Sequence, residues 1–407
     1  MTIWILVVLL LASLAALGYR QGAIRVAFST VGILVAAFLA LPLAPLLKPL
    51  MNIFGVKNMV LAWALPPAIV FIIINGLFKG AAMPVHRKVD VYFKYKTGDL
   101  RLALFERLNA RVGLCLGLLN GTLYLVLILM VIYVFGYPTV QLATSEDDPW
   151  TVRLFNRVAR DLQSTGLSRV AKALDPMPNY YYDAVDLAGL IYHNPSVESR
   201  LVRYPSLFAL SERTEFQALG KDIQFTELRQ RRASFRELTA NPNANAILQN
   251  DDLLKTIWAT VKPDMQDLAD YLRTGNTAKY GGEAILGHWS FDFTSAFNAY
   301  RRANPKLTAL QLKEQRRFMS GLFLNTTLTA GTEGFLVVRS LPKLSKPGEA
   351  FQAGSPVNLS GKWESSGSKY DLSFEQDETK TVYSAEIHGD RLTISGQALP
   401  LVFERDI

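Results

Sequence analysis

Hydrophobic residues fill four long runs in the first third of the chain, and short polar stretches separate them. The runs extend from Ile3 to Leu17, Ala23 to Leu47, Met59 to Phe78 and Val112 to Phe135. A helix rises about 1.5 Å per residue, so about 20 apolar residues cross the hydrocarbon of a bilayer. We therefore predict a four-span transmembrane helical bundle over residues 1–140, with the lipid bilayer as a partner.

The first run is short enough for a signal peptide. Its start, Met1-Thr2-Ile3-Trp4, lacks the basic residues that precede the apolar core of such a peptide. A second apolar run follows after a few residues, as in a helical hairpin. We expect an uncleaved span.

Beyond Trp150 the apolar spacing becomes that of soluble helices. Phe155, Ala159 and Leu162 recur at intervals of three and four, with arginines on the other faces. This amphipathic helix lies either on the membrane interface or at the start of a soluble domain. We predict a soluble helical region over residues 150–275.

An Asn-Pro pair recurs in this region with an offset of 47 residues. The two occurrences are Asn194-Pro195, followed by Leu201 and Leu207, and Asn241-Pro242, followed by Leu248 and Leu254. Asn suits the cap of a helix and Pro its first position. The echo indicates either two similar helical units or the chance recurrence of a helix-start signal.

A glycine-containing linker, Thr274 to Gly282, precedes a pattern of short strands. Residues 281–407 predict a small antiparallel β-barrel or sandwich of about eight strands. The expected strands are residues 287–293, 324–328, 335–338, 361–363, 370–374, 382–387, 391–394 and 399–403. We expect a helical insertion, about Ser295 to Leu322, after the first of them.

Two strands open with Gly-x-Trp, and this tripeptide resembles the opening of lipocalin-like small barrels. We expect Trp289 and Trp363 in the β-domain core. Such a barrel either holds a small apolar ligand in its mouth or is filled by its own aromatic side chains.

Charge orients the bundle. The net charge is +8, and much of the excess lies in the predicted loop between the third and fourth spans. The basic residues of that loop are Lys79, Arg87, Lys88, Lys94, Lys96, Arg101, Arg107 and Arg111. Basic loops stay in the cytoplasm, so the N-terminus and the region after the fourth span lie outside. We expect a multi-pass inner-membrane protein with a periplasmic C-terminal region, and no nucleic-acid partner, because the loop has too few aromatic residues for stacking.

Three glycines of the fourth span, Gly113, Gly117 and Gly121, are spaced by four residues. Each step turns a helix through about 400°, so the three glycines share one face. Another helix backbone can approach closely along such a face. The motif predicts helix packing, either inside the bundle or between copies in a homo-oligomer.

The turn after the first span contains Gly18, Arg20 and Gly22, and the polar segment Phe105 to Arg111 leads into the glycine run. With four short spans, this pattern resembles the colicin V production protein family (CvpA-like) over about residues 1–160. The family usually has an acidic residue beside the arginine before the glycine run, where this chain has Asn109, and Gln21 separates Arg20 from Gly22. The resemblance implies an inner-membrane protein of toxin production or export, or of envelope maintenance, with protein partners in the envelope and no catalytic residues.

Signals for chemistry are absent from the sequence. The four histidines and Cys115 have no metal-ligand spacing, and no nucleotide or hydrolase motif occurs. We expect no enzyme activity, metal or cofactor. Two alternatives remain open: a channel or transport component shaped by Pro66-Pro67 and the glycines, and a membrane-tethered sensor of an apolar ligand. The spans hold no Asp, Glu, Lys, Arg or His deep inside, which disfavours ion-coupled transport.

Overall fold

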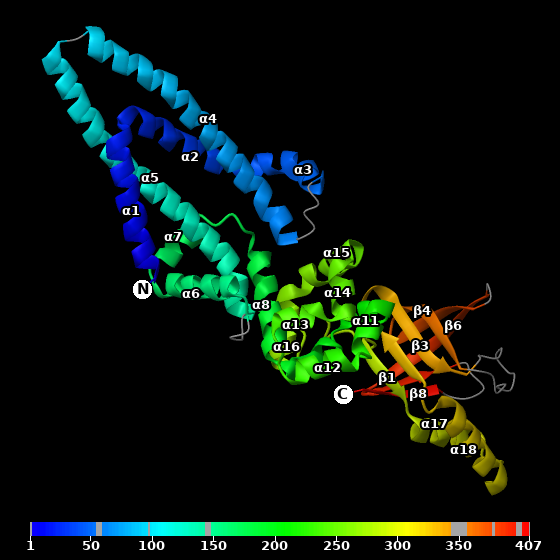
Figure 1. The fold of residues 1–407 in the computed structure, drawn as a ribbon. Coiled ribbons are helices and arrows are strands. Elements are labelled where there is room, and N and C mark those ends of the chain that lie inside the picture. Colours follow the sequence, from blue (N-terminus) through cyan, green and yellow to red (C-terminus); the bar gives the residue numbers. More distant parts are fainter. Residues whose placement is uncertain are drawn as a thin grey trace. The chain divides into compact units, whose positions relative to one another are not determined.

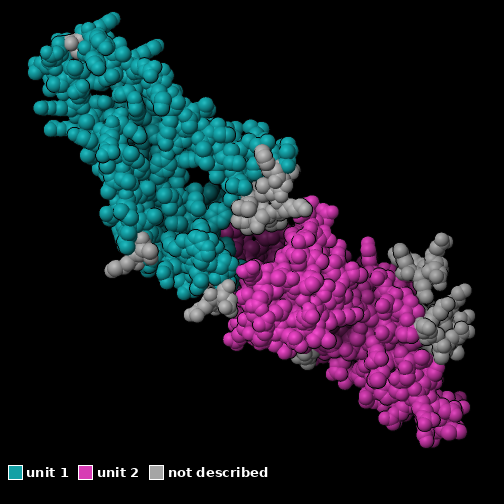
Figure 2. All heavy atoms as spheres, viewed as in Figure 1, with its two compact units in different colours: residues 1–177 teal, residues 178–407 magenta. Residues whose placement is uncertain are grey.

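The computed structural model describes residues 2–53, 59–96, 98–142, 148–342, 356–376, 379–395 and 401–406. The chain forms two compact units, residues 1–177 and 178–407 (Figure 2). This division joins the helix after Trp150 to the membrane helices, and it joins the soluble helices to the β region. The boundaries of the three expected domains, 1–140, 150–275 and 281–407, remain a prediction.

The first unit is entirely helical in its described residues. Its elements are α1 (Thr2–Gln21), α2 (Ala23–Leu43), η1 (Ala44–Leu47), α3 (Lys48–Ile53), α4 (Met59–Lys96), α5 (Asp99–Leu142), α6 (Trp150–Ser164) and α7 (Leu167–Ala173) (Figure 1). Four stretches are long and apolar enough to cross a membrane: α1, α2 with η1, α4 and α5. The prediction of four apolar spans is confirmed.

The prediction of a loop between Lys79 and Arg111 is wrong, because α4 continues to Lys96 and α5 begins at Asp99. Helix α4 has 38 residues and α5 has 44, so at 1.5 Å per residue they are about 57 and 66 Å long, against about 30 Å of hydrocarbon. Their charged halves therefore continue as helices beyond the bilayer. The rings of Phe93 and Phe105 stack with centroids 4.1 Å apart and join the two halves. We call residues 79–96 and 98–111 the basic arm.

The second unit begins with short helices. These are α8 (Asn179–His193), η2 (Pro195–Val197), α9 (Glu198–Leu201), η3 (Pro205–Leu207), α10 (Phe208–Ser211), α11 (Thr214–Gly220), α12 (Ile223–Gln230), α13 (Phe235–Ala240), α14 (Pro242–Gln249), α15 (Asp251–Val261), η4 (Lys262–Asp264) and α16 (Met265–Thr274). Asn241 caps α14 by accepting hydrogen bonds from the N–H groups of Asn243 and Ala244. The side chain of Asn194 makes no such cap, and a single 3₁₀ turn follows it. The two halves of the sequence echo therefore begin differently.

Eight antiparallel strands close into a barrel, which confirms the expected β architecture. The strands are β1 (Gly287–Phe291), β2 (Thr327–Ala330), β3 (Phe335–Leu341), β4 (Val357–Ser366), β5 (Lys369–Gln376), β6 (Thr379–His388), β7 (Arg391–Ile394) and β8 (Leu401–Arg405). Each strand pairs with its sequence neighbours, and β1 pairs with β8 to close the barrel. The strand expected at 324–328 begins later, at Thr327, because α18 continues to Phe323 and Leu324 caps it.

The helical insertion after β1 forms a hairpin of α17 (Phe293–Ala303) and α18 (Ala309–Phe323). Asp292 caps α17 by accepting from the N–H of Ser295, and Thr308 begins α18 with a capping box. Ala296, Met319 and Phe323 are buried in the barrel's hydrophobic core. The hairpin therefore starts from the core and leads outward from the barrel (Figure 1).

The soluble helices pack directly against the barrel. The ring of Phe208 lies 4.3 Å from the ring of His288 on β1, and Glu212 pairs with Arg339 on β3. Burial lowers the pKa of His288, so this ring is neutral at pH 7, and its Nδ1 lies 3.0 Å from the hydroxyl of Thr329. Helices and barrel thus share one unit.

Candidate functional site

The glycines of α5 lie against α1. A Cβ added at Gly113 would collide with the carbonyl oxygen of Gly18, and one added at Gly117 would collide with that of Leu14. A Cβ at Gly121 would lie 2.9 Å from Cδ2 of Leu11. The predicted stripe therefore forms a seam with α1 inside the unit. We call Gly18, Gly113, Gly117 and Gly121, with the α1 backbone that they touch, the glycine seam.

The turn residues meet the start of the same seam. Gly22 has φ +79°, a conformation that suits glycine, and a Cβ there would collide with the side chain of Asn109. Asn109 is the residue that departs from the family pattern, and its Oδ1 is buried without a hydrogen-bond partner among the described residues. Arg20 is exposed. The two motifs that carried the family resemblance, about 90 residues apart in sequence, are thus neighbours in space.

Mild polar groups join α2, α4 and α5 in the membrane. Asn75 donates from Nδ2 to the hydroxyl oxygen of Tyr124 at 2.7 Å, and Asn120 donates to the carbonyl of Val26 at 3.4 Å. Thr30 donates to the same carbonyl at 2.9 Å. Such bonds between membrane helices contribute about 0.6 kcal/mol each on average. This cluster holds the helices together, and its residues Asn75, Tyr124, Asn120 and Thr30 include no Asp, Glu, Lys, Arg or His that would mark an ion path.

Basic charge gathers at one end of the first unit. The contact of Gly22 with Asn109 places the α1–α2 turn beside the end of the basic arm that adjoins the fourth span. This turn has Arg20 and Arg25. The opposite ends of α1 and α5 meet α6, where Ile3 and Leu129 share a cluster with Leu162. The end with the basic arm and the α1–α2 turn therefore has ten basic residues, against the three exposed arginines of α6 at the other end.

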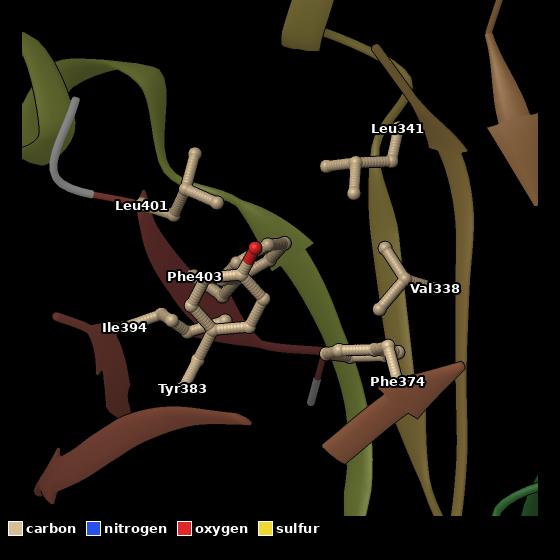
Figure 3. A pocket seen from close by; sticks show the side chains of 7 residues that line it. All are labelled: Val338, Leu341, Phe374, Tyr383, Ile394, Leu401 and Phe403. Carbon is tan, nitrogen blue, oxygen red and sulfur yellow. The ribbon is translucent and has the colours of Figure 1, made fainter. Parts of the chain in front are cut away.

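The barrel interior is filled by its own side chains. Trp289 is fully buried and donates from Nε1 to the carbonyl of Ile285 at 2.9 Å. Trp363 is partly buried against the same core and donates to the carbonyl of Gly331 at 2.8 Å. A cavity of about 20 Å³, room for one water, remains among seven side chains that point toward one another (Figure 3). They are Val338, Leu341, Phe374, Tyr383, Ile394, Leu401 and Phe403.

Arg405 closes the barrel at the end of β8. Its guanidinium lies 4.5 Å from the ring centre of Trp289, which is its register partner on β1. The same guanidinium donates to the carbonyls of Leu286 and Ala284, and the bond to Leu286 is 2.8 Å. Arg405 thus ties together the first strand, the last strand and the segment before β1.

The predicted linker, Thr274 to Gly282, is held down by two carboxylates of the α16 region. Asp267 accepts hydrogen bonds from the hydroxyl of Thr277 and the backbone N–H groups of Ala278 and Lys279. It also accepts from the hydroxyl of Tyr204, at 2.8 Å. Asp264, almost fully buried, pairs with Lys279 and accepts from Tyr280. Sequence reasoning missed this network, because acids at a helix start usually have only a capping role.

The hydrogen bonds of this network shift the pKa values of Asp267 and Tyr204. Burial alone would raise the pKa of Asp267, but the hydrogen bonds from Thr277, Tyr204 and the backbone outweigh it and lower that pKa. Burial, together with the bond to Asp267, raises the pKa of Tyr204. Asp267 is therefore ionised and Tyr204 protonated at pH 7, and the network fixes the segment between the helices and the barrel.

The α17–α18 hairpin is strongly basic. It has one acidic residue, Glu314, and six exposed basic residues: Arg301, Arg302, Lys306, Lys313, Arg316 and Arg317. None of the six forms an ion pair with a described residue. Leu310, at the start of α18, is 67% exposed. The hairpin presents a positive surface with an apolar side chain at its tip.

Grouped metal ligands are not seen in the described part of the chain, where no three His, Cys, Asp or Glu side chains come together. The four histidines lie apart, on α4, α8, β1 and β6. Cys115 lies in α5 and is exposed. The expectation of no enzyme activity, metal or cofactor stays a prediction.

Comparison with known proteins finds a match within the first unit. Residues 3–155 match the family model described as colicin V production protein. The match extends from α1 into α6 and includes the glycine seam and the basic arm. No curated protein and no solved structure matches the chain.

Proposed function

We propose that this chain, whose residues 3–155 match the colicin V production protein family, is an inner-membrane protein that serves toxin export or envelope maintenance. The membrane bundle anchors the second unit, and that unit docks a partner of the cell envelope. The family match supports the membrane role, and the basic α17–α18 hairpin supports the docking role.

Orientation follows from the polarised charge of the first unit. Lys and Arg next to membrane helices stay on the cytoplasmic side. The basic arm and the α1–α2 turn therefore face the cytoplasm. The N-terminus, α6 and residues 178–407 lie on the other side, which is the periplasm in a bacterium with two membranes.

The docking partner we propose is a protein with an acidic surface. Six unneutralised cations on one hairpin attract such a surface and steer its approach. The exposed Leu310 at the tip supplies an apolar contact inside the charged rim. The cavity of about 20 Å³ inside the barrel core admits no apolar ligand larger than a water molecule, which favours a docking role over a sensor that binds its ligand in that core. A pocket of about 150 Å³ beside the end of α18, lined by Gly321, Leu322 and Ser340 among others, leaves the sensor as an alternative.

The experiment is complementation of a deletion strain. Growth with bile salts and release of a colicin V-type peptide are measured for the full chain and for R301E/R302E/R316E/R317E. The matched control is R203E/K221E/R236E/K362E, which reverses four exposed charges elsewhere on the second unit. We expect the full chain and the control to restore both readouts and the hairpin variant to fail. A deletion strain without any defect would contradict the envelope role, and full rescue by the hairpin variant would contradict docking through it.

A transport role is the alternative that the bundle keeps open. The polar cluster around Asn75 and Asn120 is the observation in its favour, because it places hydrogen-bonding groups within the spans. Solute and ion flux into liposomes that contain the purified chain separates the two roles. We expect no flux above that of empty liposomes.

A homo-oligomer through the fourth span is also a proposal. The glycine seam is occupied by α1, so a second copy would contact another face of α5. Chemical cross-linking in native membranes tests it.

A further inference from the structure

Helix α6 packs against the end of the fourth span. Ala159 faces Gly136 so closely that a Cβ at Gly136 would lie 2.5 Å from that of Ala159. Asn156 is buried and donates from Nδ2 to the carbonyl of Thr139 at 3.0 Å. Leu162 is fully buried in a cluster with Ile3 of α1 and Leu129 of α5. One side of α6 is therefore buried against α1 and α5.

This contact sets the level of α6 in the bilayer. From Gly113, beside the α1–α2 turn, to Gly136, beside α6, α5 advances 23 residues, or about 35 Å. This distance slightly exceeds the thickness of the hydrocarbon, about 30 Å, and is less than that of the bilayer with its headgroup regions, about 40–45 Å. Helix α6 crosses the ends of α1 and α5 (Figure 1). Its position is thus the membrane–water boundary at the end away from the basic arm.

The rest of α6 is amphipathic in the way of an interfacial helix. Trp150 is 69% exposed, Leu154 47% and Phe155 40%. Such apolar side chains rarely face water together, and Trp in particular is enriched at the headgroup level. Arg153, Arg157 and Arg160 lie on an adjoining face, are exposed, and form no ion pair with a described residue. The three cations thus border the exposed side chains of Trp150 and Leu154.

We infer that α6 lies in the interface of the leaflet opposite the basic arm, where its arginines bind the phosphates of anionic phospholipids. Trp150 and Leu154 enter the boundary of the acyl chains. A guanidinium donates two parallel hydrogen bonds to phosphate oxygens, a geometry that suits a headgroup better than a neutral surface. The inference concerns the first unit alone, so it stands whether or not the second unit docks a partner.

Depth is tested by spin labels on the full chain. In a C115A background, cysteine replaces Leu154 in one variant and Gln163 in another, which is half a helical turn away and exposed at the last turn of α6. The protein is reconstituted in vesicles of phosphatidylcholine and phosphatidylglycerol. We expect collisions with oxygen to prevail at position 154 and collisions with a water-soluble nickel complex at position 163. Access of the nickel complex to both positions would overturn the inference. Exclusion of both reagents from position 154 would also overturn it, because it would show that protein and not lipid covers this side chain.

Headgroup preference is measured with spin-labelled lipids in the same vesicles. We expect the wild-type chain to associate with phosphatidylglycerol about fivefold more strongly than with phosphatidylcholine, the factor that about 1 kcal/mol gives. The R153Q/R157Q/R160Q variant should have a weaker preference than the wild type, since the basic arm still borders the other leaflet, and R301Q/R302Q/K306Q should keep the wild-type preference. A wild-type chain without preference, or an unchanged preference in the α6 variant, would show that these arginines bind no anionic lipid.

Discussion

Single glycines decide how closely α1 and α5 approach each other. At Gly117 an added methyl group collides with the carbonyl oxygen of Leu14, so the helices must separate. At Gly76 on α4 nothing lies within 4 Å of an added Cβ. The sequence spacing predicted a shared stripe of glycines, but only the structure shows that its partner is α1.

These two positions form a matched pair for mutation. We expect Gly117→Ala to lower the free energy of unfolding by about 1–3 kcal/mol, the usual cost of overpacking. Gly76→Ala should change it little, because the space there is open. Unfolding of the full chain by SDS titration in mixed micelles measures both. Equal stability of the two variants would mean that the seam is not closely packed.

Asp267 gives the second unit a dependence on pH. Its pKa is lowered in the folded chain, so its contribution to stability is present above the unfolded value near 3.8 and is lost as the pH falls through the folded value. We expect Asp267→Asn to destabilise the unit by about 2 kcal/mol at pH 7, the usual range for hydrogen bonds to a charged group. The variant should lose less stability than the wild type between pH 5 and pH 2.

Urea unfolding of the full chain in detergent, followed by tryptophan fluorescence, measures this change. Asp270→Asn is the control, because that carboxylate is largely exposed and lies 3.7 Å from the likewise exposed Arg273, an ion pair that contributes little. An Asp267 variant as stable as the control at pH 7 would show that the network contributes nothing. Sequence reasoning could not find this site, since Tyr204 and Thr277 are brought to Asp267 by the tertiary fold.

At the scale of elements, periodicity predicted best where one pattern ran undisturbed. Alternation gave the strands around Trp289 and Trp363, and apolar length gave the four spans. The basic arm was predicted as a loop because its charge ends the hydrophobic signal. Charged residues cannot be buried in lipid, but they can form a helix in water. The stack of Phe93 on Phe105 is a contact between the two helices that the charge pattern does not reveal.

The arm should therefore lose order when that stack is removed. We expect Phe93→Ala to increase hydrogen exchange over residues 88–108 by about tenfold, since an aromatic pair contributes about 0.5–1.5 kcal/mol beyond its buried area. Tyr95, which is 76% exposed, is the control, and its replacement by Ala should leave exchange unchanged. Rapid exchange of the whole arm in the wild type would instead show that the arm is a loop and not a pair of helices.

At the scale of the whole molecule, two units of different character share one chain. The family match covers residues 3–155 and accounts for the membrane bundle, but not for the helices and barrel of residues 178–407. The sequence predicted both architectures from their periods. It left open how the barrel interior is used, because side-chain volumes fill a barrel only in three dimensions. In the structure, side chains fill the barrel core and leave a cavity of about 20 Å³ among them.

We expect the second unit to be displayed outside the cytoplasm. Alkaline phosphatase and, separately, a fluorescent protein that folds only in the cytoplasm are fused after Ile407 of the full chain. Phosphatase activity without fluorescence is the expected result. Fluorescence without phosphatase activity would contradict it, because the basic arm would then lie outside and the second unit would face cytoplasmic partners.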